Sequence, residues 1–156
     1  MDLGTDGAIA GNGAGLVLYG DVSGSGTVSG TTLLGNVNIG SSPGAITLED
    51  VVMSEFATTT FEVAGTDPSH FDQLILVGSV ALDGTAQITF DNFTPDPADT
   101  FQLLDLTGGT ASSWFSSVVA PERWTLSTNG LLAVPEPTSF MLVITGMALL
   151  LLRRRR

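Results

Sequence analysis

The sequence predicts an all-β fold, either a short parallel β-helix (β-solenoid) with a C-terminal β cap or, as the alternative, a β-sandwich. Short apolar runs alternate with turns rich in Ser, Thr and Gly, and the chain has 19 Gly residues. No window before Phe140 shows the apolar stripe of an amphipathic helix. A weak repeat, L-x-L-x-G-x-V-x-x-x-G-T, occurs at residues 16–27 and again at 74–85. Strands of this kind bury their apolar faces by stacking on one another.

The individual strands follow from short runs of apolar and β-branched residues. In residues 60–63 and 86–90 apolar side chains alternate with polar ones, as in a half-buried strand. Gly20, Asp83-Gly84 and Gly108-Gly109 supply turn positions between the runs. After about Asp91 the pattern favours a closing cap, with its last steps at 124–126 and 129–134. The expected strands before the cap are 16–19, 33–34, 36–39, 45–53, 58–63, 73–77 and 85–90.

Asn36 and Asn38 lie in the short expected strand 36–39. Asparagine can form ladders between stacked strands or occupy left-handed corner positions. Ordinary loop asparagines fit the pattern equally well, so both interpretations stay open.

The charge is distributed very unevenly. Fifteen of the 16 acidic residues lie in residues 1–134, where Arg123 is the sole Lys or Arg. So acidic a body excludes nucleic-acid binding by the usual neutralisation of phosphates. The absence of Cys excludes disulfides, thiolate metal sites and a cysteine nucleophile. Residues 1–134 suit one domain.

The C-terminal segment, residues 135–156, has three parts in a fixed order. Pro135, Glu136 and Pro137 form an extended acidic motif, because each proline fixes φ and removes a donor. An uncharged stretch of 13 residues then covers roughly 20 Å as a helix, short of the ~30 Å hydrocarbon core. We therefore expect a transmembrane segment at about 139–152 that inserts transiently. Its apolar residues include Phe140, Leu142, Val143, Ile144, Leu149 and Leu152, and Arg153, Arg154, Arg155 and Arg156 form a basic stop.

This order of motif, apolar run and arginines resembles the PEP-CTERM sorting signal. The resemblance implies that an exosortase-type membrane protease recognises Pro135, Glu136 and Pro137. It further implies export across the inner membrane, a transient membrane stage through the C-terminal helix, and a final location at the cell surface or in the extracellular matrix. Residues 33–134 resemble autotransporter-like β-helical passengers, for example in Ser42-Pro43-Gly44 and the step that follows. An exported chain should begin with a signal peptide, and the first residues do not form one. We therefore expect the natural start to lie upstream.

Few residues in the body form a pattern with chemical meaning. His70, with Asp67 and Asp72 nearby, lacks the G-x-S-x-G elbow of a hydrolase and fits a loop histidine better. Asp91, Asp96 and Asp99 are weak Ca²⁺ candidates, because their spacing matches no EF-hand or nonapeptide loop.

Trp114 and Trp124 allow two interpretations. Their aromatic faces could contact a glycan, although a cap over the end of the core is favoured.

The sequence therefore predicts a non-enzymatic surface or matrix protein of structural or adhesion type. It predicts no cofactor, an exosortase-type protease as partner, and exopolysaccharide as a further candidate partner. The alternative is a carbohydrate-binding module or the end of a larger polysaccharide-acting β-helix protein. A third interpretation, a cytoplasmic fragment with a fortuitous tail, would be excluded by an upstream signal peptide.

Overall fold

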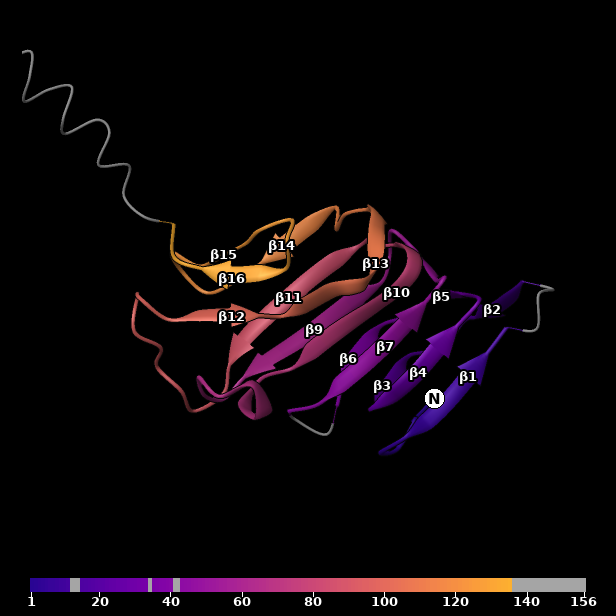
Figure 1. Cartoon of the computed structure of the whole chain (residues 1–156), viewed down its shortest axis with the longest axis horizontal. Helices are drawn as coiled ribbons and strands as arrows, with labels where there is room; N and C mark the ends of the chain where they lie inside the picture. The colour runs from indigo at the N-terminus through magenta and orange to yellow at the C-terminus, as the bar shows by residue number, and fades with distance from the viewer. Residues whose placement is uncertain (12–14, 34, 41–42, 136–156) are drawn as a thin grey trace, which may run out of the picture.

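The regular secondary structure of the described residues is almost entirely β, and most of its strands pair in parallel, as the computed structural model shows (Figure 1). The structure describes residues 1–11, 15–33, 35–40 and 43–135. The one helical element in these residues is a short 3-10 turn, η1 (Pro68–His70). The strands are β1 (Gly7–Ala10), β2 (Leu16–Leu18), β3 (Val22–Gly24), β4 (Gly26–Ser29), β5 (Thr31–Leu33), β6 (Val37–Ile39), β7 (Ala45–Glu49), β8 (Val52–Met53), β9 (Thr58–Val63), β10 (Gln73–Ala81), β11 (Thr85–Phe90), β12 (Thr100–Gln102), β13 (Leu104–Ser113), β14 (Ser117–Val119), β15 (Thr125–Leu126) and β16 (Leu131–Ala133).

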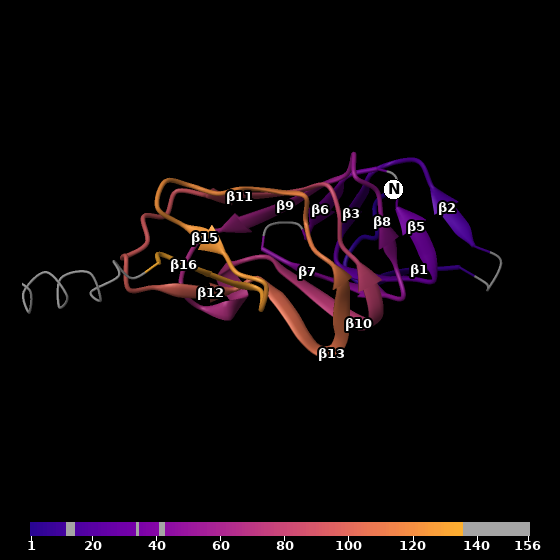
Figure 2. The ribbon, with the colours of Figure 1, turned by 90° about the horizontal axis from the view of Figure 1, so that it is seen from above.

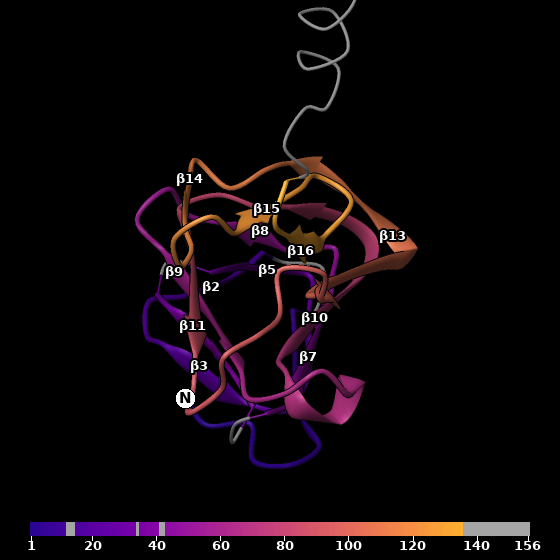
Figure 3. The same cartoon turned by 90° about the vertical axis from the view of Figure 1, so that its left-hand side faces the viewer.

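The strands form two parallel sheets and one small antiparallel sheet. The larger sheet has eight strands in the order β1-β4-β7-β10-β8-β5-β2, with β13 also paired to β10. The second has five strands in the order β14-β11-β9-β6-β3. Seen along the molecule, these parallel strands nearly close around a central core (Figure 3). The antiparallel sheet, β12-β16-β15, lies at the end opposite β1 and β2 (Figure 2).

The length of chain between paired strands increases along the sequence. In the five-stranded sheet Val22 pairs with Val37, which pairs in turn with Thr59. Thr59 then pairs with Ala86, and Ala86 with Val118. The successive spacings are thus 15, 22, 27 and 32 residues. The expected parallel β-solenoid of similar coils is therefore not established, because the strands are not joined at a constant interval.

The predicted combination of a solenoid or sandwich with a C-terminal transmembrane helix is wrong as stated. The all-β character is present, but no helix in the part of the chain that the structure describes is long and apolar enough to span a membrane. The predicted segment at about 139–152 lies outside the described residues. The predicted transient membrane stage through a C-terminal helix is corrected with it, because the described residues contain no such helix. A physical limit was already present in the sequence, since the 13 uncharged residues 140–152 would reach only about two thirds of the ~30 Å core as a helix.

Alternate side chains of the strands build the core. In β9, Thr59, Phe61 and Val63 are buried, while the side chains between them are half-buried. The same alternation occurs in β7 and in the first half of β10. Phe61 and Phe101 are the largest side chains that are fully buried. Each contributes on the order of 2–3 kcal/mol by its removal from water.

Polar side chains connect the strands across one corner. The backbone N–H of Asn36 donates to Asp21 Oδ1 at 2.8 Å, and the N–H of Thr58 donates to Asn36 Oδ1 at 2.9 Å. Each side chain thus supplies an acceptor just before the paired strands β3, β6 and β9 begin. Asn36 thus holds a corner through its side chain, and a ladder of stacked asparagines is not shown. Asn38, in contrast, is exposed in the middle of β6 and pairs through its backbone with Ser23 and Thr60.

Candidate functional site

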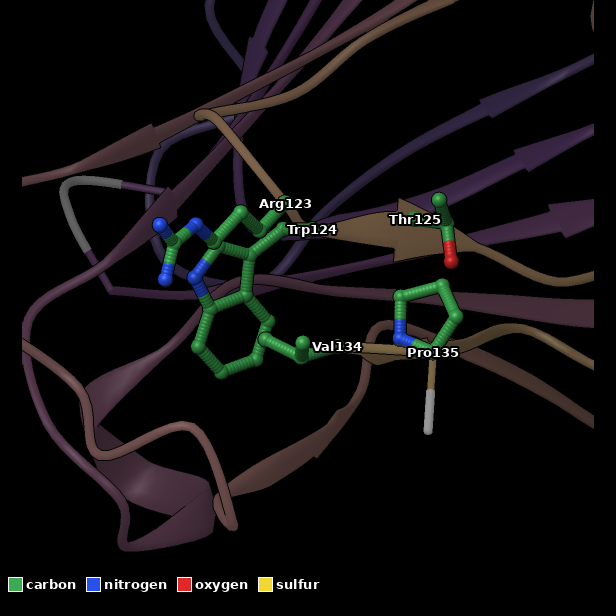
Figure 4. A pocket seen from close by; sticks show the side chains of 5 residues that line it. All are labelled: Arg123, Trp124, Thr125, Val134 and Pro135. Atoms are coloured by element: carbon green, nitrogen blue, oxygen red, sulfur yellow. The ribbon is translucent and has the colours of Figure 1, made fainter. Parts of the chain in front are cut away.

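A shallow pocket of about 540 Å³ opens beside the antiparallel sheet (Figure 4). Arg123, Trp124, Thr125, Val134 and Pro135 line it. The pairing of β15 with β16 places Thr125 opposite Ala133, and this brings residues 134 and 135 next to the indole. The short antiparallel pair of β15 and β16 therefore brings together the two segments that line the pocket.

The turn before β15 contains Arg123, whose guanidinium lies at the pocket. Arg123 has φ 75°, in the left-handed region that side chains other than Gly rarely adopt. The N–H of Trp124 donates to Pro121 O at 3.0 Å, which closes this turn. Arg123 is the sole Lys or Arg before residue 153 in the sequence. The single strong cation of the acidic body thus lies on the rim of the pocket.

Trp124 contributes both to the core and to the pocket. Its ring lies 5.3 Å from Phe90 in an edge-to-face arrangement and 5.5 Å from Phe101, measured between ring centroids. Only part of the indole is buried, and the side chain also lines the pocket. The favoured role in closing the core is therefore supported by these contacts, and the glycan-contact role stays a prediction.

Trp114 lies elsewhere. It follows β13 in the connection to β14, is half-buried, and packs edge-to-face on Phe115 with centroids 5.6 Å apart. It does not line the pocket of Trp124. The structure thus gives the two tryptophans separate surroundings.

The three aspartates proposed for Ca²⁺ mainly organise their own loop. Asp99 Oδ2 accepts from the N–H of Asp96 at 2.8 Å, and Asp96 Oδ1 accepts from the N–H of Ala98 at 2.9 Å. Asp91 Oδ1 accepts from the side-chain amide of Asn92. Within the described residues no group of three or more His, Cys, Asp or Glu side chains could hold a metal ion. Ca²⁺ binding here stays an untested prediction.

No hydrogen bond in the described part of the chain joins His70 to the carboxylates beside it. Asp67 Oδ1 caps η1 by accepting from the N–H and the hydroxyl of Ser69. These hydrogen bonds from Ser69 lower the pKa of Asp67. The carboxylate of Asp72 accepts hydrogen bonds from the backbone of Gly44 and of Glu62, and not from His70. The described residues therefore do not form a Ser-His-Asp triad at His70.

Asp72 is a buried acid whose role the sequence did not reveal. It is 2% exposed, and its carboxylate joins two neighbouring segments. Oδ1 accepts from the N–H of Gly44 and Oδ2 from the N–H of Glu62, each at 2.8 Å. Burial raises the pKa of Asp72 to about 6 despite these two hydrogen bonds, and the nearby charge of Glu62 adds to the rise. The one sequence signal was its position between Phe71 and Leu74, two buried apolar residues.

We expect the stability of the protein to fall as the pH rises through about 6. Because the folded pKa of Asp72 lies above its ordinary value of 3.8, the folded state binds its proton more tightly than the unfolded chain does. This contribution is complete below pH 3.8 and disappears as Asp72 ionises. Urea unfolding at pH 5.0 should give a free energy larger by on the order of 1 kcal/mol than at pH 7.5.

The matched variant is Asp72→Asn, which cannot ionise. Its difference between pH 5.0 and 7.5 should be clearly smaller than that of the wild type. An unchanged pH dependence would show that Asp72 is not the group responsible.

The predicted sorting motif begins where the described chain ends. Pro135 is exposed and follows β16 by one residue. Glu136, Pro137, the apolar residues of 140–152 and Arg153–Arg156 lie outside the described residues. Only the first residue of the motif is therefore placed by the structure.

Comparison of the chain with family models, curated proteins and solved structures finds no match.

Proposed function

We propose that the chain is a non-catalytic structural or adhesion-type protein of the bacterial surface or extracellular matrix. In this proposal an exosortase-type protease recognises Pro135, Glu136 and Pro137. The observation that supports it best is the exposed position of Pro135, two residues beyond β16, the last strand in the described residues. A protease needs an extended, accessible segment, and proline on both sides of Glu136 keeps the backbone extended.

The character of the body agrees with this proposal. Fifteen acids against one arginine keep the domain soluble and disfavour binding to nucleic acid. Of the carboxylates considered for chemistry, Asp67 and those of the loop at 91–99 accept hydrogen bonds from their own neighbours. Such groups stabilise turns rather than carry out a reaction.

Processing in a host that has an exosortase tests the sorting motif. We expect Glu136→Gln to reduce the processed form at least tenfold, because the motif loses its sole charge. Glu122→Gln is the control, since Glu122 is an exposed acid in the same end of the body. Processing of Glu136→Gln at the wild-type level would contradict the proposal, provided that both proteins give the same circular dichroism spectrum.

A second candidate function is binding of carbohydrate, including exopolysaccharide, and the pocket at Trp124 favours it. A half-buried indole beside a guanidinium offers an apolar face for a sugar ring and donors for its oxygens. On a glycan array, Trp124→Ala and Arg123→Gly should each lower binding at least tenfold. Arg123→Gly is useful because Gly adopts the positive φ of this position without strain.

The control for this second candidate is Trp114→Ala, because Trp114 lies outside the pocket. Equal binding by all three variants and the wild type, or no binding by the wild type, would exclude this pocket as a carbohydrate site.

A further inference from the structure

The five-stranded sheet carries straight rows of polar side chains on its outer face. β9 buries every second side chain, so that Thr58, Thr60 and Glu62 point outward. Parallel pairing continues these positions across the neighbouring strands without a shift of register (Figure 2). Neighbours in a row are therefore about 4.8 Å apart. The longer rows are Ser23, Asn38, Thr60, Gln87 and Val119, and Thr58, Thr85 and Ser117.

The protein itself does not use the polar groups of these two rows. Within the described residues, their hydroxyl and amide side chains make no hydrogen bond to the protein. Elsewhere such groups often have partners: Ser113 Oγ donates to Leu82 O, and Gln102 Nε2 donates to Leu104 O, each at 2.6 Å. Hydroxyls and amides can both donate and accept. The face thus offers a repeating set of donors and acceptors to a ligand.

This face is also nearly uncharged, although the chain has a net charge of −11. Glu62 is the one charged residue at the outward positions of the five described strands, and it lies in a short third row with Thr89. The outer side of the eight-stranded sheet differs, because it includes the acids Glu49 and Asp105 and the apolar Ile75. A neutral, hydrogen-bonding surface is therefore confined to the smaller sheet.

We propose that the outer face of the five-stranded sheet binds an extended, neutral polysaccharide. Its sugar residues repeat at an interval similar to the strand spacing, so that successive hydroxyls can bond along a row. The acidic body disfavours nucleic acids and anionic polymers. A peptide strand cannot add to β6, β9 or β11, which are paired on both sides, and the rows lack the aromatic or Arg anchors of protein interfaces.

The proposal goes beyond the proposed function, because it concerns a different surface from the pocket at Trp124 and does not depend on the sorting motif. Native gel electrophoresis of the full chain in the presence of a dissolved polymer tests it. Hydroxyethyl cellulose, which is neutral and extended, should retard the protein. Carboxymethyl cellulose, which has the same backbone with added carboxylates, should bind at least tenfold more weakly. No retardation by hydroxyethyl cellulose, or equal retardation by both polymers, would overturn the proposal.

A pair of threonine substitutions locates the binding. Thr60→Val combined with Thr85→Val removes one hydroxyl from each row and keeps a β-branched side chain that suits a strand. Binding of hydroxyethyl cellulose should weaken at least fivefold. The control is Thr27→Val with Thr47→Val, because these threonines align with each other at half-buried outward positions of the other sheet. Equal effects of the two pairs would contradict the assigned face.

Two further variants separate this face from the pocket at Trp124. Gln87 is exposed, so Gln87→Leu removes an amide from the middle row without touching the core, and it should also weaken binding. Arg123→Gly alters the pocket and should bind like the wild type. Loss of binding in Arg123→Gly, with Gln87→Leu unchanged, would place the polysaccharide in the pocket and overturn the proposal.

Discussion

Replacing Phe101 with Ala should lower the free energy of unfolding by about 3–5 kcal/mol. Phe101 is completely buried and lies at the centre of an aromatic cluster, whose other members are Phe71, Phe90, Phe93 and Trp124. Its ring centroid lies between 5.5 and 6.3 Å from each of theirs. Alanine would leave a cavity and remove four aromatic contacts at once. Urea unfolding at constant pH measures the loss.

Phe56→Ala is the control for this prediction. Phe56 is 82% exposed, so its truncation should change the stability by no more than about 0.5 kcal/mol. Phe101→Leu should lie between the two, because it keeps an apolar side chain of smaller volume. If Phe101→Ala cost as little as Phe56→Ala, the aromatic cluster would not be the structure that closes this end of the core.

The strands with clear alternation could be predicted from the sequence. The expected strands at 58–63 and 85–90 agree with β9 and β11. The expected strand at 45–53 is instead two strands, β7 and β8, separated by a corner at Asp50. Asp50 has φ 49°, and its Oδ1 accepts from the N–H of Ser79 at 2.8 Å. That corner depends on a contact 29 residues away, which no local pattern reveals.

The strands β3, β4 and β5 could not be separated by pattern, because each has three or four residues and Ser, Thr and Gly predominate in them. The weak repeat was also misleading. Leu16 pairs with Thr31 in β5, whereas its counterpart in the repeat, Leu74, pairs with Ile46 and Leu104. These two leucines thus occupy different places in the sheet. A constant offset cannot mark equivalent positions when the spacing between paired strands grows along the chain.

The candidate site was predictable only in part. Trp124 was recognised as an aromatic residue of the last third, but its position beside Pro135 depends on the antiparallel pairing of β15 with β16. The two-residue strand β15 is too short to give a periodic signal. For Asp72, likewise, the sequence indicates only a position beside His70. Its actual partners, Gly44 and Glu62, are 28 and 10 residues away.

Gly84→Ala should destabilise the protein by about 2–5 kcal/mol, through two separable effects. Gly84 has φ +72°, and a side chain in this region costs roughly 1–2 kcal/mol. A Cβ at this position would also lie 2.0 Å from the carbonyl oxygen of Ala57. That oxygen accepts the N–H of Thr85 at 2.9 Å, which begins the pairing of β11 with β9. Relief of the overlap must therefore disturb a bond of the sheet, at a further cost of about 1–3 kcal/mol.

Gly15→Ala separates the two effects, because Gly15 has the same φ of +72° and no atom within 4 Å of an added Cβ. It should lose only the conformational part, about 1–2 kcal/mol. The difference between the two variants, measured by urea unfolding, isolates the close approach of the backbones at Gly84. Equal losses would mean that the strands can separate at this corner without cost. A larger loss at Gly84 would show that close stacking of neighbouring segments, and not only the turn at the corner, requires glycine there.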